Sequence, residues 1–180
     1  MSLPFASFRP VHAAASAAVA VLLAAGCASA PAPQAQAPAK AEPAQMVATV
    51  RAAAGSGEGE LAVAPLRDPM VEDLRQQAVE LEKAGKYAES AAALDQALGI
   101  VPDDPAVLQE RAEAALLLRD FEGAEQRARR AFELGAKVGP LCRRHWATVR
   151  AVRFAANDGA GAAQARQQLD ACKVAALERF

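Results

Sequence analysis

Two cysteines near the C-terminal end of the sequence have positions that suit a disulfide bond. Cys142 and Cys172 flank the segment Asn157-Asp158-Gly159, which is a strong turn signal between two helices. Residues at equal distances from the turn of an antiparallel helix pair lie side by side, and Asn157 is the midpoint of the two cysteines. We therefore predict a Cys142–Cys172 disulfide. The alternative is two buried free thiols that behave as small apolar side chains.

The other side chains that could do chemistry do not form a catalytic or metal-binding pattern. His145 is the only histidine after His12, and one histidine beside two bridged cysteines is too small a ligand set for a metal site. We expect it to lie at the surface or to be partly packed. No phosphate-binding loop, nucleophile motif or Cys-x-x-Cys pair occurs. The sequence therefore predicts a protein that is not an enzyme, with no catalytic residue, metal, cofactor or small-molecule substrate.

The first 26 residues are typical of a secretory signal peptide. Arg9 is the only charged residue before Lys40, and an apolar run from Ala13 to Ala25 follows it. At about 1.5 Å per residue, a helix of this length would cover roughly 20 Å of a hydrocarbon core that is about 30 Å thick. The run is therefore too short to span a membrane. We predict that residues 1–26 are removed on export.

The end of this run resembles the bacterial lipobox. Residues 22–27 read Leu-Leu-Ala-Ala-Gly-Cys, so small residues precede Cys27. The resemblance implies that Cys27 is lipidated and becomes the first residue of a lipoprotein, held by multiple acyl chains. Because Ala28 and not an aspartate follows the cysteine, the same resemblance implies, in a Gram-negative cell, transfer to the outer membrane with the protein facing the periplasm. Ordinary secretion, with cleavage near Ala28-Ser29-Ala30, is the alternative.

A tether is expected between the lipid anchor and the rest of the protein. Residues 27–45 are rich in proline and alanine and lack large apolar side chains, so they cannot form a core. We assign residues 46–68 as a poorly defined extended segment without an independent domain. Three apolar residues could instead form a short helix before the glycine-rich break at residues 55–57; they are Met46, Val47 and Val50.

Residues 69–138 match themselves at an offset of 34 residues, which is the period of the tetratricopeptide repeat (TPR). The segment 85–98 resembles the second helix of a TPR unit, and Pro102-Asp103-Asp104-Pro105 resembles the turn that closes one unit. The matched pairs are Leu74 with Leu108, Ala78 with Ala112, Tyr87 with Phe121, Leu94 with Ala128, and Ala97 with Ala131. The sequence therefore resembles that of a TPR protein.

This resemblance implies an all-α fold, a short TPR-like helical solenoid of about three antiparallel helix pairs. It would cover residues 69–180, with repeats at about 71–104 and 105–138 and a degenerate repeat at 139–180. Small residues such as Ala78 would let two helices approach closely. The alternative is a generic helical bundle with accidental self-similarity.

In TPR proteins the first helix of each repeat lines a concave groove. Carried over by alignment, the resemblance selects seven candidate residues for contact with a partner: Arg75, Val79, Glu82, Gln109, Glu113, Arg143 and Arg150. Trp146 could pack inside the stack or stand exposed as an interface anchor.

The partner implied by this resemblance is another envelope protein or a peptide segment, with membrane contact through the lipid anchor. The expected function is that of an adaptor or assembly factor for envelope machinery. A regulatory subunit that binds and modulates an envelope enzyme is the alternative. Nucleic acid is not expected, because the net charge is -1 and aromatic residues make up only 4% of the chain.

Charge is graded along the expected domain. Acidic residues outnumber basic residues by eight to three in residues 69–104, whereas basic residues outnumber acidic residues by seven to three in residues 139–180. This polarity could steer a charged partner, or it could belong to an ordinary solvated surface. The arginine-rich C-terminal end could also meet an anionic polymer.

Overall fold

The computed structural model describes residues 42–55 and 67–173, which form seven α-helices and no strand. The all-α fold class predicted from the sequence is confirmed. No helix in these two ranges is long and apolar enough to span a membrane. The predicted signal peptide and Cys27 lie outside the described residues. The helices are α1 (Pro43–Ala52), α2 (Pro69–Lys83), α3 (Tyr87–Ile100), α4 (Pro105–Leu117), α5 (Phe121–Leu134), α6 (Gly139–Ala155) and α7 (Gly159–Ala171).

Aspartate side chains cap the start of four helices. The carboxylate of Asp104 accepts hydrogen bonds from the backbone N–H groups of Ala106 and Val107, at 2.8 and 3.2 Å. Pro105 then occupies the first turn of α4, where its missing N–H costs no helical hydrogen bond. Equivalent caps begin α2, α5 and α7, and they are formed by Asp68, Asp120 and Asp158. The local sequence therefore fixes these helix starts.

The turn between the two helices of each pair contains a residue in the left-handed conformation. Gly85 between α2 and α3 has φ 74°, Arg119 between α4 and α5 has φ 61°, and Asn157 between α6 and α7 has φ 57°. Glycine and asparagine adopt such values readily, whereas arginine does so at some cost. Gly85 and Arg119 are one 34-residue period apart. The turn geometry therefore repeats with the sequence.

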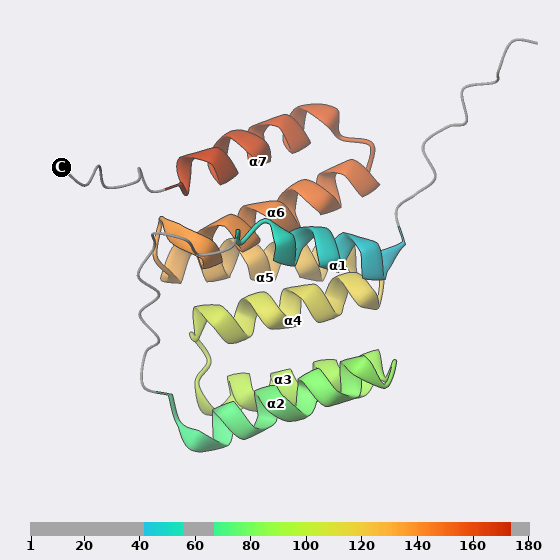
Figure 1. The fold of residues 1–180 in the computed structure, drawn as a ribbon, viewed down its shortest axis with the longest axis vertical. Helices are drawn as coiled ribbons and strands as arrows, with labels where there is room; N and C mark the ends of the chain where they lie inside the picture. Colours follow the sequence, from blue (N-terminus) through green and yellow to red (C-terminus); the bar gives the residue numbers. More distant parts are fainter. Residues whose placement is uncertain (1–41, 56–66, 174–180) are drawn as a thin grey trace, which may run out of the picture. The chain divides into compact units, whose positions relative to one another are not determined.

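Helices α2 to α7 stack as three antiparallel pairs in the order of the sequence (Figure 1). α2 packs on α3, α4 on α5 and α6 on α7, while α3–α4 and α5–α6 contacts join the neighbouring pairs. Alanines allow the helices to approach closely. Four of them are at most 3% exposed: Ala78, Ala97, Ala112 and Ala131.

Helix α4 is enclosed by its neighbours. Every residue from Val107 to Leu117 is buried except the partly exposed Glu110. Helices α1, α3, α5 and α6 all contact α4. Polar side chains on this helix must therefore find hydrogen-bond partners inside the protein.

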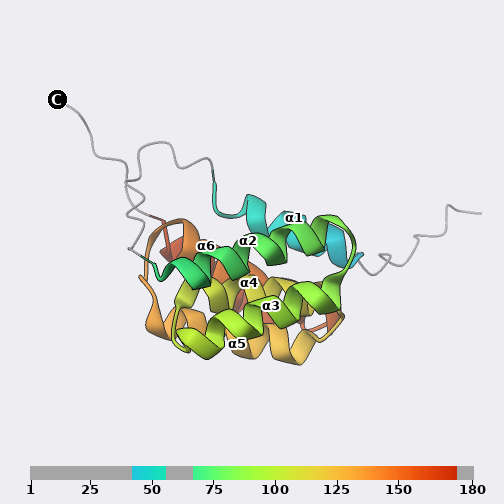
Figure 2. The same cartoon turned by 90° about the horizontal axis from the view of Figure 1, so that it is seen from below.

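The segment before α2 contains a packed helix, which corrects the extended assignment for residues 46–52. Residues 56–66 of that assignment lie outside the described residues. Helix α1 contacts α4 and α6, and Figure 2 shows it on the side of the stack away from α3 and α5. Its side chains Met46, Val47 and Val50 are 6%, 3% and 0% exposed. These residues form an apolar stripe on one face of the helix, which explains why a ten-residue helix is stable here. Residues 43–45 of the tether expected over residues 27–45 belong to this helix, and residues 27–41 lie outside the described residues.

A disulfide joins the two ends of the third helix pair. Cys142 in α6 is bonded to Cys172, which follows α7, and their Cα atoms are 5.7 Å apart. The backbone N–H of Gly139 also donates to the carbonyl of Cys172 at 2.8 Å. The pairing predicted from the turn at Asn157 is confirmed.

Candidate binding groove

A cavity of about 400 Å³ lies beside helices α1, α2 and α4, and we call it the α1–α2 pocket. Its apolar lining includes Val79, which is 48% exposed. Its lining is otherwise mostly charged, and the residues are Arg51, Ala54, Arg75, Ala78, Val79, Glu82, Lys83, Ser90, Leu94, Glu110 and Arg144.

Arg75 joins α2 to α4 at one side of the pocket. Its Nε donates to Glu110 at 2.8 Å, and a second nitrogen donates to the other oxygen of the same carboxylate. Its Nη1 also donates to Glu72 at 2.6 Å. The hydrogen bonds with Glu110 are the main reason that the pKa of Arg75 lies above its usual value. Arg75 is therefore always positively charged, and its guanidinium nitrogens already donate hydrogen bonds to Glu72 and Glu110.

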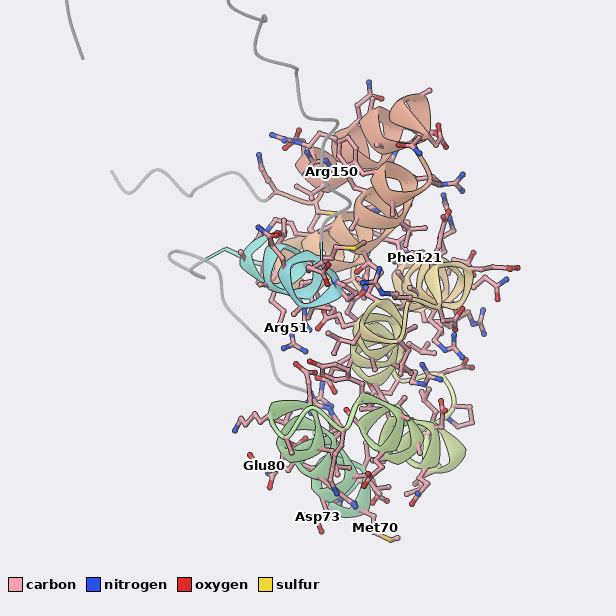
Figure 3. All side chains as sticks on the ribbon, turned by 90° about the vertical axis from the view of Figure 1, so that its right-hand side faces the viewer. Arg51, Met70, Asp73, Glu80, Phe121 and Arg150 are labelled. Atoms are coloured by element: carbon pink, nitrogen blue, oxygen red, sulfur yellow. A yellow bond between two sulfur atoms is a disulfide. The ribbon has the colours of Figure 1, made fainter. Side chains whose placement is uncertain are left out.

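Arg51 extends from α1 toward α2 at the other side of the pocket (Figure 3). Its two terminal nitrogens donate to the two oxygens of Glu82 at 2.7 and 2.9 Å, and its Nε donates to Glu113 at 2.8 Å. The hydrogen bonds to Glu82 make the largest contribution to raising the pKa of Arg51 above its usual value. This side chain therefore links α1 to both α2 and α4.

The carboxylate of Glu113 is fully buried and receives several donors. Its Oε1 accepts from Arg144 at 2.9 and 2.6 Å and from the amide of Gln109 at 2.9 Å. Its Oε2 accepts from Arg51. A buried charge is tolerated when it is paired and hydrogen-bonded in this way. Glu113 thus ties α1, α4 and α6 together.

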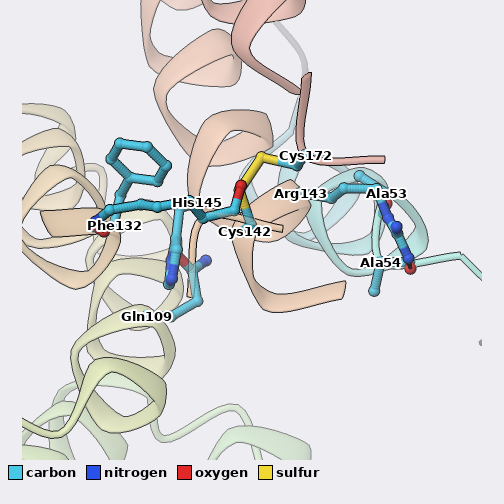
Figure 4. The surroundings of a disulfide bond; sticks show 9 residues. Ala53, Ala54, Gln109, Phe132, Cys142, Arg143, His145 and Cys172 are labelled. Carbon is cyan, nitrogen blue, oxygen red and sulfur yellow. Dashed lines mark hydrogen bonds between the residues drawn. A yellow bond between two sulfur atoms is a disulfide. The ribbon is translucent and has the colours of Figure 1, made fainter. Parts of the chain in front are cut away.

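His145 belongs to the same polar network and is only 1% exposed, which corrects the expectation of a surface or partly packed histidine. The amide nitrogen of Gln109 donates to Glu113 and to the hydroxyl of Thr148. The amide oxygen therefore faces the imidazole and accepts from His145 Nδ1 at 2.8 Å (Figure 4). Burial, reinforced by Arg144 and Lys137, lowers the pKa of His145 to about 3.

This shift gives the domain a pH-dependent stability. His145 stays neutral in the folded state near neutral pH, whereas the unfolded chain takes up a proton below pH 6.5. Stability is therefore fully present above that pH and falls as the pH drops from 6.5 toward 3. Between pH 7.5 and pH 5 we expect a loss of about 2 kcal/mol in the free energy of unfolding. Urea titrations of wild type and His145→Asn check this, because the variant should lose much less; equal losses would contradict the assignment.

The structure brings three of the seven predicted groove residues together at the α1–α2 pocket: Arg75, Val79 and Glu82. Two more, Gln109 and Glu113, are 0% exposed. Their assignment to an open partner-binding surface is corrected, because α4 is covered and their polar groups bond within the protein. Sequence reasoning did not select the other eight lining residues, among them Arg51 and Arg144.

The remaining two predicted groove residues also lie elsewhere. Arg143 is 8% exposed, and its Nε donates to the carbonyl oxygens of Ala53 and Ala54 at 3.2 and 3.0 Å (Figure 4). It thus binds the C-terminal end of α1, where helical carbonyls lack partners. The guanidinium of Arg150 lies 4.9 Å from the ring of Phe154 and does not line the pocket.

Trp146 packs within the stack. Its ring meets the ring of Phe132 edge to face, with 5.0 Å between centroids, and the guanidinium of Arg129 lies 5.5 Å from it. A second cavity of about 350 Å³ adjoins this residue. Two arginines there, Arg129 and Arg153, both donate to Glu125. None of the seven predicted groove residues lines this cavity, whereas three of them line the α1–α2 pocket, which is therefore the better candidate site.

Comparison with known proteins finds a solved domain that part of the chain resembles. No protein-family model and no curated protein sequence matches the chain. Among solved structures, the chain is similar to the globular C-terminal domain of P. aeruginosa LpoP, with 31% sequence identity and a TM-score of 0.56. The match covers 58% of this chain and 99% of the LpoP chain. This chain has an LpoP-like C-terminal domain. The helical architecture is consistent with the TPR resemblance, but no TPR family model matches the chain.

Within residues 42–55 and 67–173, no cluster of three or more potential ligands could hold a metal ion.

Proposed function

We propose that this chain is an envelope lipoprotein whose helical domain binds and regulates another envelope protein. The likeness to the LpoP domain supports an adaptor or regulator in the cell envelope. Of the two roles expected from the sequence, we favour regulation of an envelope enzyme, and a penicillin-binding protein is the first partner class to test.

The proposed anchor is a lipidated Cys27 in the outer membrane, with the domain facing the periplasm. Sixteen residue steps separate Cys27 from Pro43, and a chain of this length spans at most roughly 55 Å. The domain would therefore stay near the membrane and act on a partner within that reach. A tether of this kind also raises the effective concentration of the domain near a membrane-bound enzyme.

The observation that carries the proposed mode of binding is the α1–α2 pocket with Val79 at its edge. Protein interfaces commonly have an apolar centre with a polar rim, and Val79 with its charged neighbours would supply one half of such a contact. The charged groups of Arg75 and Glu82 are already held by partners within the chain, so they are preorganised for contact. A partner segment with an apolar side chain between polar groups would suit this site.

Substituting Val79→Asp is expected to weaken binding of a purified penicillin-binding protein at least about tenfold, because a carboxylate would replace the apolar contact. The full chain with Cys27→Ser, which cannot be lipidated, serves as the parent. Val79 is exposed, so the variant should keep its thermal stability. The measurement is the dissociation constant, together with the rate of the enzyme's glycan polymerisation.

Val138→Asp is the matched control, because Val138 is 51% exposed and Val79 is 48% exposed, and Val138 does not line the pocket. Its affinity should stay within about twofold of the parent. Equal affinity of both variants would place the interface elsewhere. Absence of binding by the parent to every penicillin-binding protein of the same cell would reject this partner class.

A further inference from the structure

Helix α1 packs on the surface that α4 and α6 form together. Its apolar stripe of Met46, Val47 and Val50 is buried in a cluster with Leu116 and Val152 of the two receiving helices. Helix α1 therefore covers an apolar surface of the stack. The same helix segment also borders the α1–α2 pocket, because Arg51 and Ala54 are among its lining residues.

Polar contacts fix the direction and position of this helix. Arg51 pairs with Glu82 and Glu113, and Arg143 binds the carbonyls of Ala53 and Ala54. Helix α1 contributes the apolar stripe and the Arg51 cation that pairs with two carboxylates of the stack. The stack contributes the Arg143 cation that binds the C-terminal end of α1. Together they make a specific recognition surface for one helix in one orientation.

Two observations indicate that α1 is an addition to a complete stack. It has ten residues and no side-chain cap at its N-terminus, and helices of this length are marginal in water without tertiary contacts. It forms no antiparallel pair, unlike α2 to α7.

We propose that the surface of α4 and α6 under α1 is a binding site for an amphipathic helix of the partner protein, and that α1 occupies this site until the partner helix replaces it. The partner helix has aliphatic side chains at positions i, i+1 and i+4 and an arginine at i+5, the spacing of Met46, Val47, Val50 and Arg51. This inference rests on the proposed function for one point only, which is that the ligand is a protein.

The arginine is required because of Glu113. This carboxylate is 0% exposed, and departure of α1 would leave it with Arg144 as its remaining cationic partner. A replacing helix without a cation at the same place would leave buried charge poorly compensated. The site therefore selects helices of the α1 pattern over other amphipathic helices.

The first test measures whether α1 leaves the stack while the rest stays folded. In the full chain with Cys27→Ser, Val50→Cys places a buried thiol on α1, and Val149→Cys places a matched buried thiol on α6; the native side chains are 0% and 2% exposed. Under native conditions the thiol at position 50 should react with a thiol reagent at least about a hundredfold faster. Equal rates would mean that α1 opens only when the domain unfolds, which would overturn the proposal.

The second test uses a fluorescent peptide of residues 42–55 as the probe. Val50→Asp in the full chain should release α1, so that this chain binds the peptide at least about tenfold more tightly than wild type does. The same peptide with Arg51→Glu should lose at least about tenfold in affinity. Circular dichroism establishes that the variant keeps α2 to α7 folded.

Failure of the folded Val50→Asp chain to bind the peptide would overturn the proposal. Unfolding of that variant, together with equal labelling rates at positions 50 and 149, would do the same, because α1 would then be a fixed part of the fold. Both tests use only this chain and its own peptide. Their failure would leave the proposed regulation of an envelope enzyme standing.

Discussion

Replacing both Arg51 and Arg144 with methionine is expected to lower the free energy of unfolding by about 3–5 kcal/mol. The two arginines donate to the carboxylate of Glu113, which is fully buried. Arg51 itself is 45% exposed, so solvent screens its own charge and the pair adds little by attraction alone. The loss comes from leaving the Glu113 carboxylate buried without a cation. Urea denaturation followed by circular dichroism measures it.

A third substitution separates the charge effect from packing. Adding Glu113→Gln removes the buried charge while it keeps the shape and part of the hydrogen bonding of the side chain. Most of the lost stability should return in the triple variant, since the three residues form one coupled network. A triple variant as unstable as the double variant would show that the arginines act through packing, and would contradict the account.

Removing the disulfide with Cys142→Ala and Cys172→Ala is expected to cost about 3–4 kcal/mol, because the bond closes a loop in the unfolded chain. The two residues are 30 positions apart. Both are buried, at 0% and 1% exposed, so the alanines also leave slightly less packed volume. The unfolding midpoint in urea should fall accordingly.

Chemical reduction of wild type provides the control for the disulfide. Wild type in reducing buffer should approach the stability of the double alanine variant, and the variant itself should not respond to the reductant. A difference below about 1 kcal/mol between oxidised and reduced wild type would mean that α6 and α7 hold together without the bond.

The parts of the fold that follow from local spacing could be predicted from the sequence. The 34-residue period pairs Ala78 with Ala112 and Ala97 with Ala131, and all four are buried where helices meet. The disulfide followed from Asn157 as the midpoint of an antiparallel pair. In both cases the relevant contacts repeat at fixed distances along the chain, so a single sequence contains the information.

Long-range contacts account for what the sequence did not reveal. Helix α1 has only three large apolar side chains on its stripe and follows a proline- and alanine-rich segment, so its periodicity is weak. Its stability depends on α4 and α6, and Arg51 meets Glu113, 62 positions later in the chain. The spacing of Met46, Val47 and Val50 was the available signal for this helix.

The same limit applies to the polar residues of the groove. Alignment with TPR proteins places Gln109 and Glu113 on the first helix of a repeat, which would be an open face. Here α1 and α6 cover that face, and His145 bonds to Gln109 across 36 positions. No pattern local to His145 reveals that partner. Burial of these side chains therefore became evident only from the arrangement of the helices.

Crosslinking in living cells from position 79 tests the central claim most directly, namely that this domain regulates an envelope enzyme through the face containing the α1–α2 pocket. A photoreactive amino acid replaces Val79 in the anchored full chain, and an otherwise identical chain carries it at Val138. We expect a crosslink to one envelope enzyme from position 79, no such crosslink from position 138, and loss of the crosslink in a Cys27→Ser chain. A crosslink to the enzyme from position 138 but not from position 79 would contradict the account.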